Sequence, residues 1–177
     1  MNADNPSAAL GKEQARVLTE ALPYLHAYHG KTFVIDYARR SSGRPAAWNS
    51  LGRDLALLSL VGLRLVVVHR GDVLNAELVS LINRHERRAA GLSGVDGGFL
   101  QARAAPLTEQ HASHLEIAQV DPTLLHMHFA KGFLPAVRPL GTTPDGQVCP
   151  MEGDQVAAAI AAQLKAAKLI VMRDPQD

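Results

Sequence analysis

The sequence predicts an α/β protein of one domain, in three layers, with a mainly parallel central sheet and helices on both of its faces. Three observations favour this class. Runs rich in valine, isoleucine and leucine alternate along the chain with segments of helical period, as in parallel strands joined by crossover helices. Several of these runs are apolar at nearly every position, which is typical of strands covered on both sides. The 177 residues, 47% hydrophobic and 20% charged, suit a single globular domain.

The N-terminal part of the chain is expected to form a flexible lead-in over residues 1–12 and then a helix over residues 13–28. Apolar residues in this helix recur at spacings of three and four, which is the helical period. Pro23 removes one backbone donor and is expected to kink the helix. The β-branched and aromatic residues that follow predict a buried strand over residues 31–37. Residues 13–177 are expected to form one domain.

The middle of the chain continues the alternation of helices and strands. Pro45 suits the first turn of a helix over residues 46–60, and residues 63–69 are nearly all apolar, as in a buried strand. A third helix is expected over residues 73–85 and a short strand over residues 87–92. A glycine-rich turn and another extended segment then follow over residues 93–98 and 99–103.

The C-terminal part begins with the least regular stretch, residues 104–120, which is expected to be a loop with a hairpin arm. The remaining elements are indicated by helix-start signals, stop glycines and apolar runs. They are a helix over residues 123–131, a strand over residues 133–140, an alanine-rich helix over residues 153–167 and a last strand over residues 168–174.

The charge and the cysteine content exclude several classes of protein. A net charge of +1 argues against nucleic acid as a main partner, because proteins that bind it concentrate Lys and Arg on one face. The single cysteine, Cys149, excludes a disulfide framework and a cysteine-based zinc site. The N-terminus does not resemble a signal peptide, and the longest apolar tract, residues 55–68, falls short of the ~20 residues of a membrane span. A cytoplasmic protein without nucleic-acid or membrane partners is expected.

Eight histidines raise the hypothesis of a metal site, above all the pairs His111/His114 and His126/His128. On a helix, positions two apart do not share a face, which argues against the second pair. No carboxylate or cysteine completes a ligand set at a familiar spacing. We therefore expect neither a metal nor another cofactor.

Several segments together resemble one family of enzymes. In chain order they are ALPYLHAYHGKTFVIDY, LVGLRLVVVH, LVSLINRH, AAGLSGVDGG, DPTLLHMHFAKGFLPAVRPLG and DGQVCPMEGDQVAAAIAAQLKAAKLIVMRD. In this order they resemble the N-terminal lobe of the acetylglutamate kinases, of the amino acid kinase family, from about Leu18 to Asp174. The resemblance implies the N-lobe of the amino acid kinase fold. Members of this group also have a second, nucleotide-binding lobe, for which this sequence shows no matching segment.

The resemblance also implies a catalytic apparatus from which this sequence departs. In the family the first strand ends in a Lys-x-Gly-Gly loop, whose lysine stabilises the phosphoryl group in flight, and here Asp36 stands in place of that lysine. A carboxylate at this position opposes the charge that develops in the transition state. The second strand leads into His-Gly-Gly-Gly in the family, whereas only the middle glycine, Gly71, is kept here. The family's substrate loop has no counterpart between Leu74 and Leu78.

Asp154 matches the aspartate that organises the catalytic lysines in the family. It also opens the predicted helix over residues 153–167, where a carboxylate meets the helix dipole and caps free amides, so a structural role is the simpler interpretation. Gly71 likewise permits a turn from strand to helix. We expect no catalytic residue, with Asp154 as a possible relic of one.

Four arginines follow the first two predicted strands, at the end of a parallel sheet where ligands usually bind. With Gly71 they form the candidate ligand-binding set, which is Arg39, Arg40, Arg44 and Arg70. Clustered guanidinium groups there could hold a phosphate or a carboxylate. The alternative is that they are solvated surface charges.

The predicted helix over residues 73–85 carries apolar residues around more of its circumference than one sheet face covers. The candidate interface residues on it are Val73, Leu74, Leu78, Leu81 and Ile82. The related kinases dimerise through the equivalent helix, so a homodimer is expected. Some of them also form a hexameric ring through an N-terminal helix, which makes Tyr24 and Tyr28 candidate anchors of a higher oligomer.

Three functional hypotheses remain open. The first is an inactive kinase-like protein, a pseudokinase, that acts as a self-associating interaction or regulatory module and binds an unidentified protein partner. The second is a binder or sensor of an anionic small molecule at the arginine-lined mouth of the sheet. The third is an acetylglutamate kinase of arginine biosynthesis. The departures from the family's catalytic apparatus favour the first.

Overall fold

The centre of the fold is a five-stranded parallel sheet. The computed structural model describes residues 6–39, 45–71, 75–85, 87–104 and 115–173. The strands of the sheet are β1 (Thr32–Arg39), β2 (Arg64–Gly71), β3 (Arg88–Ser93), β6 (Phe133–Arg138) and β9 (Lys168–Arg173). They lie in the order β3–β6–β2–β1–β9, and each pair of neighbours is parallel. Each strand lies where an apolar run predicts one, with small shifts at its ends.

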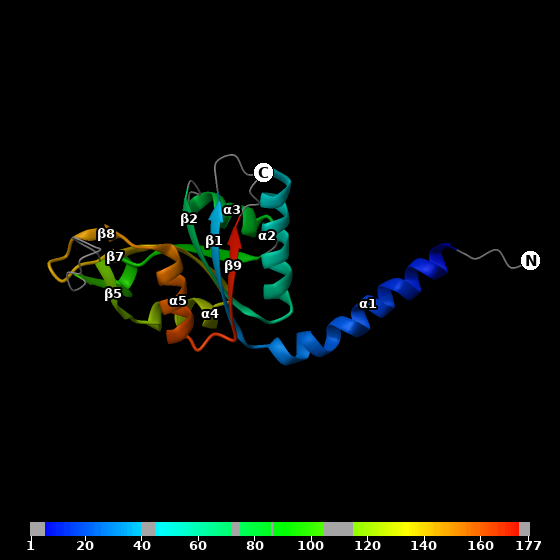
Figure 1. Cartoon of the computed structure of the whole chain (residues 1–177). Helices are drawn as coiled ribbons and strands as arrows, with labels where there is room; N and C mark the ends of the chain where they lie inside the picture. Colours follow the sequence, from blue (N-terminus) through cyan, green and yellow to red (C-terminus); the bar gives the residue numbers. More distant parts are fainter. Residues whose placement is uncertain (1–5, 40–44, 72–74, 86, 105–114, 174–177) are drawn as a thin grey trace, which may run out of the picture.

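Helices cover both faces of this sheet, so the predicted three-layer α/β fold is confirmed (Figure 1). The helices are α2 (Pro45–Leu60) and α3 (Asn75–Asn83) on one face, and α4 (Thr123–Ala130) and α5 (Gly153–Gln163) on the other. Side chains of β1 alternate between the two layers: Phe33 and Ile35 pack with α2 and α3, and Val34 packs with α5. The same alternation places Asp36 on the α5 face of the sheet.

A second, four-stranded sheet packs beside α5, and the sequence indicated only part of it. Its strands are β4 (Leu100–Ala104), β5 (Leu115–Val120), β7 (Leu140–Thr142) and β8 (Val148–Pro150), in the order β5–β4–β7–β8. Residues 115–120 form a strand antiparallel to β4, which agrees with the hairpin arm expected within residues 104–120, and β4 lies in the extended segment expected over residues 99–103. β7 and β8 have three residues each, too few for an apolar period to appear in the sequence.

The glycine-rich turn after β3 lets two segments of backbone approach each other closely at Gly94. Gly94 has room for no side chain, because a Cβ there would collide with the backbone carbonyl of Leu140 and with the side chain of Leu100. The Asp96 carboxylate accepts hydrogen bonds from the backbone N–H and the hydroxyl of Ser93, at 2.6 and 3.2 Å. These contacts close the turn on itself, in agreement with the prediction of a structural turn.

The N-terminal helix, α1 (Pro6–Tyr28), projects away from the rest of the described chain (Figure 1). It begins earlier than predicted, because residues 6–12, which were expected to be flexible, are helical. Its C-terminal end is anchored where the ring of Tyr28 packs edge-on against Phe33, with 5.1 Å between the ring centroids. Pro23 lies inside the helix. Among the described helices, none is long and apolar enough to span a membrane.

Candidate functional site

The buried carboxylate of Asp36 lies near the carboxyl end of the parallel sheet. This is the end at which the sequence departs from the pattern of the kinases. In the register of the sheet, Ala38 of β1 lies between Arg70 of β2 and Arg173 of β9. Because side chains two residues apart share a face, Asp36 points to the same side as Ala38 and its two neighbours. Both arginines therefore reach back along the α5 face of the sheet to one aspartate.

One oxygen of this carboxylate holds both guanidinium groups. Asp36 Oδ2 accepts a hydrogen bond from Arg70 Nη2 and one from Arg173 Nη1, each at 3.0 Å. The side chain of Asp36 is fully buried, whereas those of Arg70 and Arg173 are 25% and 45% exposed. Among the described residues, nothing donates to Asp36 Oδ1 or accepts from Arg70 Nε. We call these three residues the Asp36 cluster, and its formal charge is one positive unit when the carboxylate is ionised.

The start of α5 closes over the side of the Asp36 cluster. A Cβ on Gly153, the first residue of α5, would lie 2.9 Å from Arg70 Cδ, so the arginine stem runs directly against the helix backbone. Asp154 is exposed, and its Oδ1 accepts a hydrogen bond from the backbone N–H of Gln155 at 2.8 Å. This contact stabilises the first turn of the helix, which agrees with the structural interpretation of Asp154.

A second polar group lies on the other face of β2. His69 is 1% exposed, and its Nε2 lies 3.1 Å from Asn75 Oδ1. The Asn75 amide nitrogen donates to the carbonyl of Leu92 at 3.0 Å, so its oxygen is the atom that accepts from His69. The imidazole therefore carries a proton on Nε2, and through Asn75 it links the end of β2 to the start of α3 and the end of β3.

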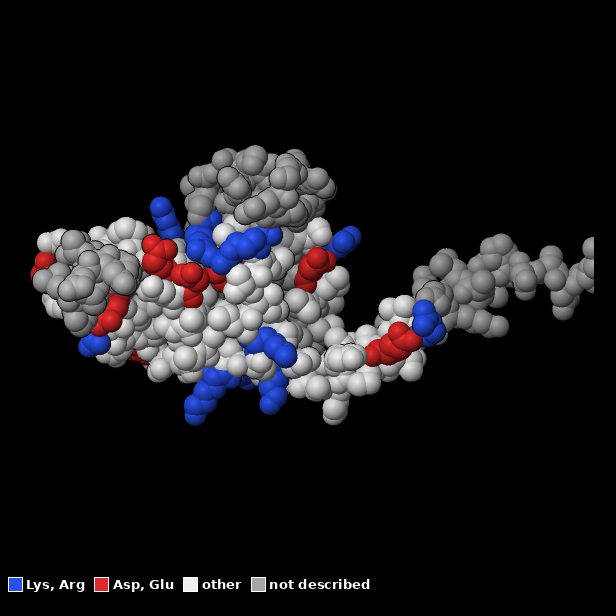
Figure 2. Space-filling model, in the orientation of Figure 1, with Lys and Arg blue, Asp and Glu red and all other residues white. Residues whose placement is uncertain are grey.

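The predicted anion-binding set is only partly visible. Arg39 ends β1 but its side chain is not described, and Arg40 and Arg44 lie outside the described residues. Gly71 ends β2, as the prediction of a strand-to-helix turn requires. Arg70 Nη2 donates a hydrogen bond to Asp36 Oδ2, and ligand binding at this position stays a prediction. Figure 2 shows Lys and Arg side chains gathered beside Asp and Glu side chains at this end of the sheet.

The predicted interface on α3 needs correction. Leu78, Leu81 and Ile82 are each at most 1% exposed, because they pack against the parallel sheet and α2. They cannot supply exposed area to a dimer interface. Val73 and Leu74 lie outside the described residues. The dimer itself stays a prediction, and the apolar residues of α3 no longer argue for it.

The N-terminal candidates differ from each other. Tyr28 is partly buried against the chain's own core, and the Lys168 Nζ lies 6.0 Å from its ring centroid. Tyr24 is 67% exposed and is not among the residues packed against that core. Only Tyr24 is therefore available as an anchor for another molecule.

The carboxylates with a shifted pKa lie far from this end of the sheet and belong to turns. A hydrogen bond from the Thr123 side chain, reinforced by its backbone N–H, lowers the pKa of Asp121. The Thr143 hydroxyl, with the backbone N–H of Asp145, lowers the pKa of Asp145. Within the described part of the chain, no three histidine, cysteine or acidic side chains are grouped as a metal would require.

The sequence did not identify Arg173 or Asn75. Arg173 meets Asp36 across 137 positions of sequence, and this contact depends on β9 lying next to β1. The order of the strands in a parallel sheet cannot be predicted from local sequence patterns. Asn75 gave a weak signal, because asparagine before a helix that follows a strand is typical of a helix start.

The comparisons with known proteins agree with the fold. A family model described as the amino acid kinase family matches residues 71–175. The chain belongs to the amino acid kinase family. Among its members, an acetylglutamate kinase from Chromobacterium violaceum is 32% identical over 203 aligned positions, which cover 90% of this chain and 70% of that protein. One from Alkalilimnicola ehrlichii is also 32% identical, and the match covers 97% of this chain and 71% of that protein.

The alignment shows that this family member is shortened within the matched region. Since 90% of 177 residues is about 159, about 44 of the 203 aligned positions in the Chromobacterium comparison have no residue in this chain. A missing segment is what the lack of a substrate loop leads us to expect.

Two solved structures share the fold at low sequence identity. Both are N-acetylglutamate synthase from Neisseria gonorrhoeae, with TM-scores of 0.72 and 0.67 at 20% and 22% identity. Each match covers 88% of this chain, but the chain spans only 44% and 46% of those proteins. They support the amino acid kinase fold for this chain.

Proposed function

We propose that this family member is catalytically inactive and acts as a self-associating interaction module. The observation that carries the proposal is Asp36. It stands where the resemblance expects the catalytic lysine, it is fully buried, and it is paired with two arginines. A site built around a carboxylate is poorly suited to a triphosphate.

The electrostatics of the Asp36 cluster support this proposal. Phosphoryl transfer depends on cations that are free to follow the charge on the equatorial oxygens of the transferred group. Arg70 and Arg173 instead direct their hydrogen bonds to Asp36 Oδ2. An incoming phosphate would have to break these bonds and leave a buried carboxylate beside its own negative charge.

Titration calorimetry with magnesium and ATP tests this proposal at the binding step. We expect no heat of binding for the full chain at protein concentrations that reveal micromolar affinity. The acetylglutamate kinase from Chromobacterium violaceum, measured in parallel, is the positive control. A micromolar dissociation constant for this chain would contradict the proposal.

The names of the relatives favour a second candidate function. The curated proteins that match this chain are named acetylglutamate kinase, and they are matched over about 70% of their length. An active kinase is therefore the competing candidate, and it predicts the opposite result in the titration. An anion sensor at the mouth of the sheet has less support, because an anion there would compete with Asp36 for the hydrogen bond from Arg70.

The support for self-association comes from α1. Its residues Val17, Leu22 and Tyr24 are 53%, 59% and 67% exposed, and the helix projects from the domain (Figure 1). Isolated helices in water are marginal, and most of their stability in proteins comes from packing an apolar face. A helix of 23 residues with uncovered apolar side chains therefore favours association with a second copy of the chain.

Replacing these three residues by serine is expected to dissolve any assembly larger than a dimer. The triple variant Val17→Ser, Leu22→Ser, Tyr24→Ser keeps Tyr28 and its contact with Phe33, so the domain should fold as before. Light scattering at micromolar concentration measures the mass. Val148→Ser is the matched control, since Val148 is 58% exposed on β8, away from α1. A wild-type mass of one 19.0 kDa chain would contradict self-association altogether.

A further inference from the structure

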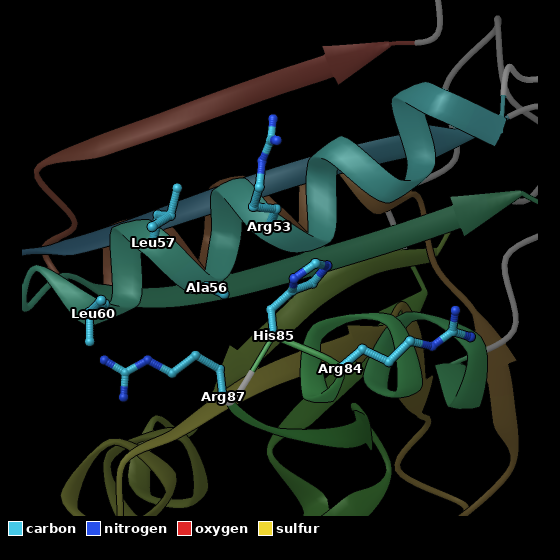
Figure 3. A pocket seen from close by; sticks show the side chains of 7 residues that line it. All are labelled: Arg53, Ala56, Leu57, Leu60, Arg84, His85 and Arg87. Atoms are coloured by element: carbon cyan, nitrogen blue, oxygen red, sulfur yellow. The ribbon is translucent and has the colours of Figure 1, made fainter. Parts of the chain in front are cut away.

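A pocket rimmed by arginines lies at the opposite end of the parallel sheet from the Asp36 cluster. It opens where α2 ends and where the chain passes from α3 to β3, and its volume is about 370 Å³. Its main lining residues are Arg53, Leu57, Leu60, Arg84, His85 and Arg87. We call it the arginine pocket (Figure 3). No local sequence pattern marks this pocket, because Arg53 lies about 30 residues from Arg84 and Arg87 in the sequence.

Two of these arginines have no carboxylate partner among the residues that the structure describes. Arg53 lies 3.7 Å from its neighbour Asp54, a contact between two exposed side chains that contributes little. No carboxylate that the structure describes lies within ion-pair distance of Arg84 or Arg87. Glu86 lies between them in sequence and is outside the described residues. The pocket thus presents positive charge that the described chain does not neutralise.

The wall between the arginines is apolar. Leu57 and Leu60 of α2 are 51% and 67% exposed, and Ala56 forms a buried floor beside them. Leucines this exposed at one helix end, rimmed by cations, are typical of a surface that another molecule covers. A site that binds by charge alone would not need these exposed leucines.

The directions of the side chains distinguish between kinds of ligand. Figure 3 shows Arg53, Arg84 and Arg87 reaching away from one another around the leucines. A compact anion such as phosphate would meet at most one or two of them, because guanidinium groups that point apart cannot all donate to one small anion. An extended segment with several carboxylates and apolar side chains between them would match both the rim and the wall.

We propose that the arginine pocket binds an acidic, amphipathic peptide segment of a protein partner. Carboxylates of the segment pair with Arg84, Arg87 and Arg53, and its apolar residues cover Leu57 and Leu60. This site is at the other end of the sheet from the Asp36 cluster, so the proposal does not depend on whether the chain transfers phosphate.

Fluorescence anisotropy with designed peptides tests the proposal on the full chain. The probe is a labelled peptide of about 15 residues with glutamate and leucine at helical spacing, compared with a lysine–leucine peptide and a glutamate–serine peptide of the same length. We expect the glutamate–leucine peptide to bind at least about tenfold more tightly than either comparison peptide. We also expect its affinity to fall when salt is raised from about 50 to about 300 mM.

Variants locate the binding. The double variant Arg84→Glu, Arg87→Glu is expected to weaken binding at least about tenfold, and Leu60→Ser about threefold or more. Arg138→Glu is the matched control: Arg138 is exposed at the carboxyl end of β6, the opposite end of the sheet, and should change affinity by less than about twofold. If the double variant fails to fold, as its melting curve would reveal, the Leu60→Ser variant carries the test.

Several results would overturn the proposal. They are an absence of binding at about 1 mM peptide, equal binding of the glutamate–serine peptide, and unchanged affinity in the Arg84/Arg87 or Leu60 variants. Equal binding of the glutamate–serine peptide would mean general attraction of polyanions. None of these results bears on the ATP titration, so the two proposals can fail separately.

Discussion

Arg70→Ala is expected to lower the free energy of unfolding by about 3 kcal/mol, one of the largest effects of any single substitution away from the apolar core. The reason is that Asp36 is fully buried and depends on its two guanidinium partners. Removing one partner leaves a buried charge that is only half compensated, which costs more than the pair itself contributes. For a chain of this size, the melting temperature should fall by roughly 6–12 °C.

Arg173→Ala should cost less, about 1 kcal/mol, because its side chain is 45% exposed and water can solvate what it leaves behind. Arg103→Ala is the matched control. Arg103 pairs with Glu116 at 2.6 Å in an exposed contact, so its loss should also cost no more than about 1 kcal/mol.

A double-mutant cycle separates the charge effect from lost packing of the arginine stem. In an Asp36→Asn background the buried charge is gone, so Arg70→Ala should cost less than about 1 kcal/mol there. The coupling energy between the two positions is then about 2 kcal/mol. Urea unfolding of the four proteins measures it. If the two substitutions are additive, the Asp36 cluster does not stabilise the fold in the way that its geometry implies.

The parallel sheet could be predicted from the sequence because each of its strands is an apolar run between helical segments. β2, for example, is fully buried from Leu65 to Val68, and its sequence shows this directly. The order of the strands could not be predicted, since it depends on contacts between segments far apart. For this reason Asp36 was recognised as a departure from the family pattern, while its partner Arg173 was not.

The predicted interface on α3 went wrong for a related reason. The sequence shows that α3 has more apolar residues than one sheet face can cover, but it does not show that α2 packs on the same helix and covers the remainder. Leu81 lies so close to α2 that a Cβ on Gly52 would be 2.6 Å from its Cγ. A glycine at that position permits close helix packing, and its meaning becomes clear only once both helices are placed.

The second large effect concerns catalysis. If Asp36 replaces the lysine that stabilises the phosphoryl group in the family, the chain should lack phosphoryl transfer rather than show a reduced rate. Asp36→Lys is not expected to restore it. A lysine there would be buried beside Arg70 and Arg173, three cations without a carboxylate, and should destabilise the protein by more than about 3 kcal/mol.

A coupled assay with ATP and acetylglutamate, at high concentration of the full chain, tests catalytic inactivity most directly. The Chromobacterium violaceum acetylglutamate kinase under the same conditions shows that the assay responds. For the wild-type chain we expect no turnover above the protein-free background. Turnover approaching the range of roughly 1 to 100 per second that is usual for kinases would contradict the account and make this chain an enzyme.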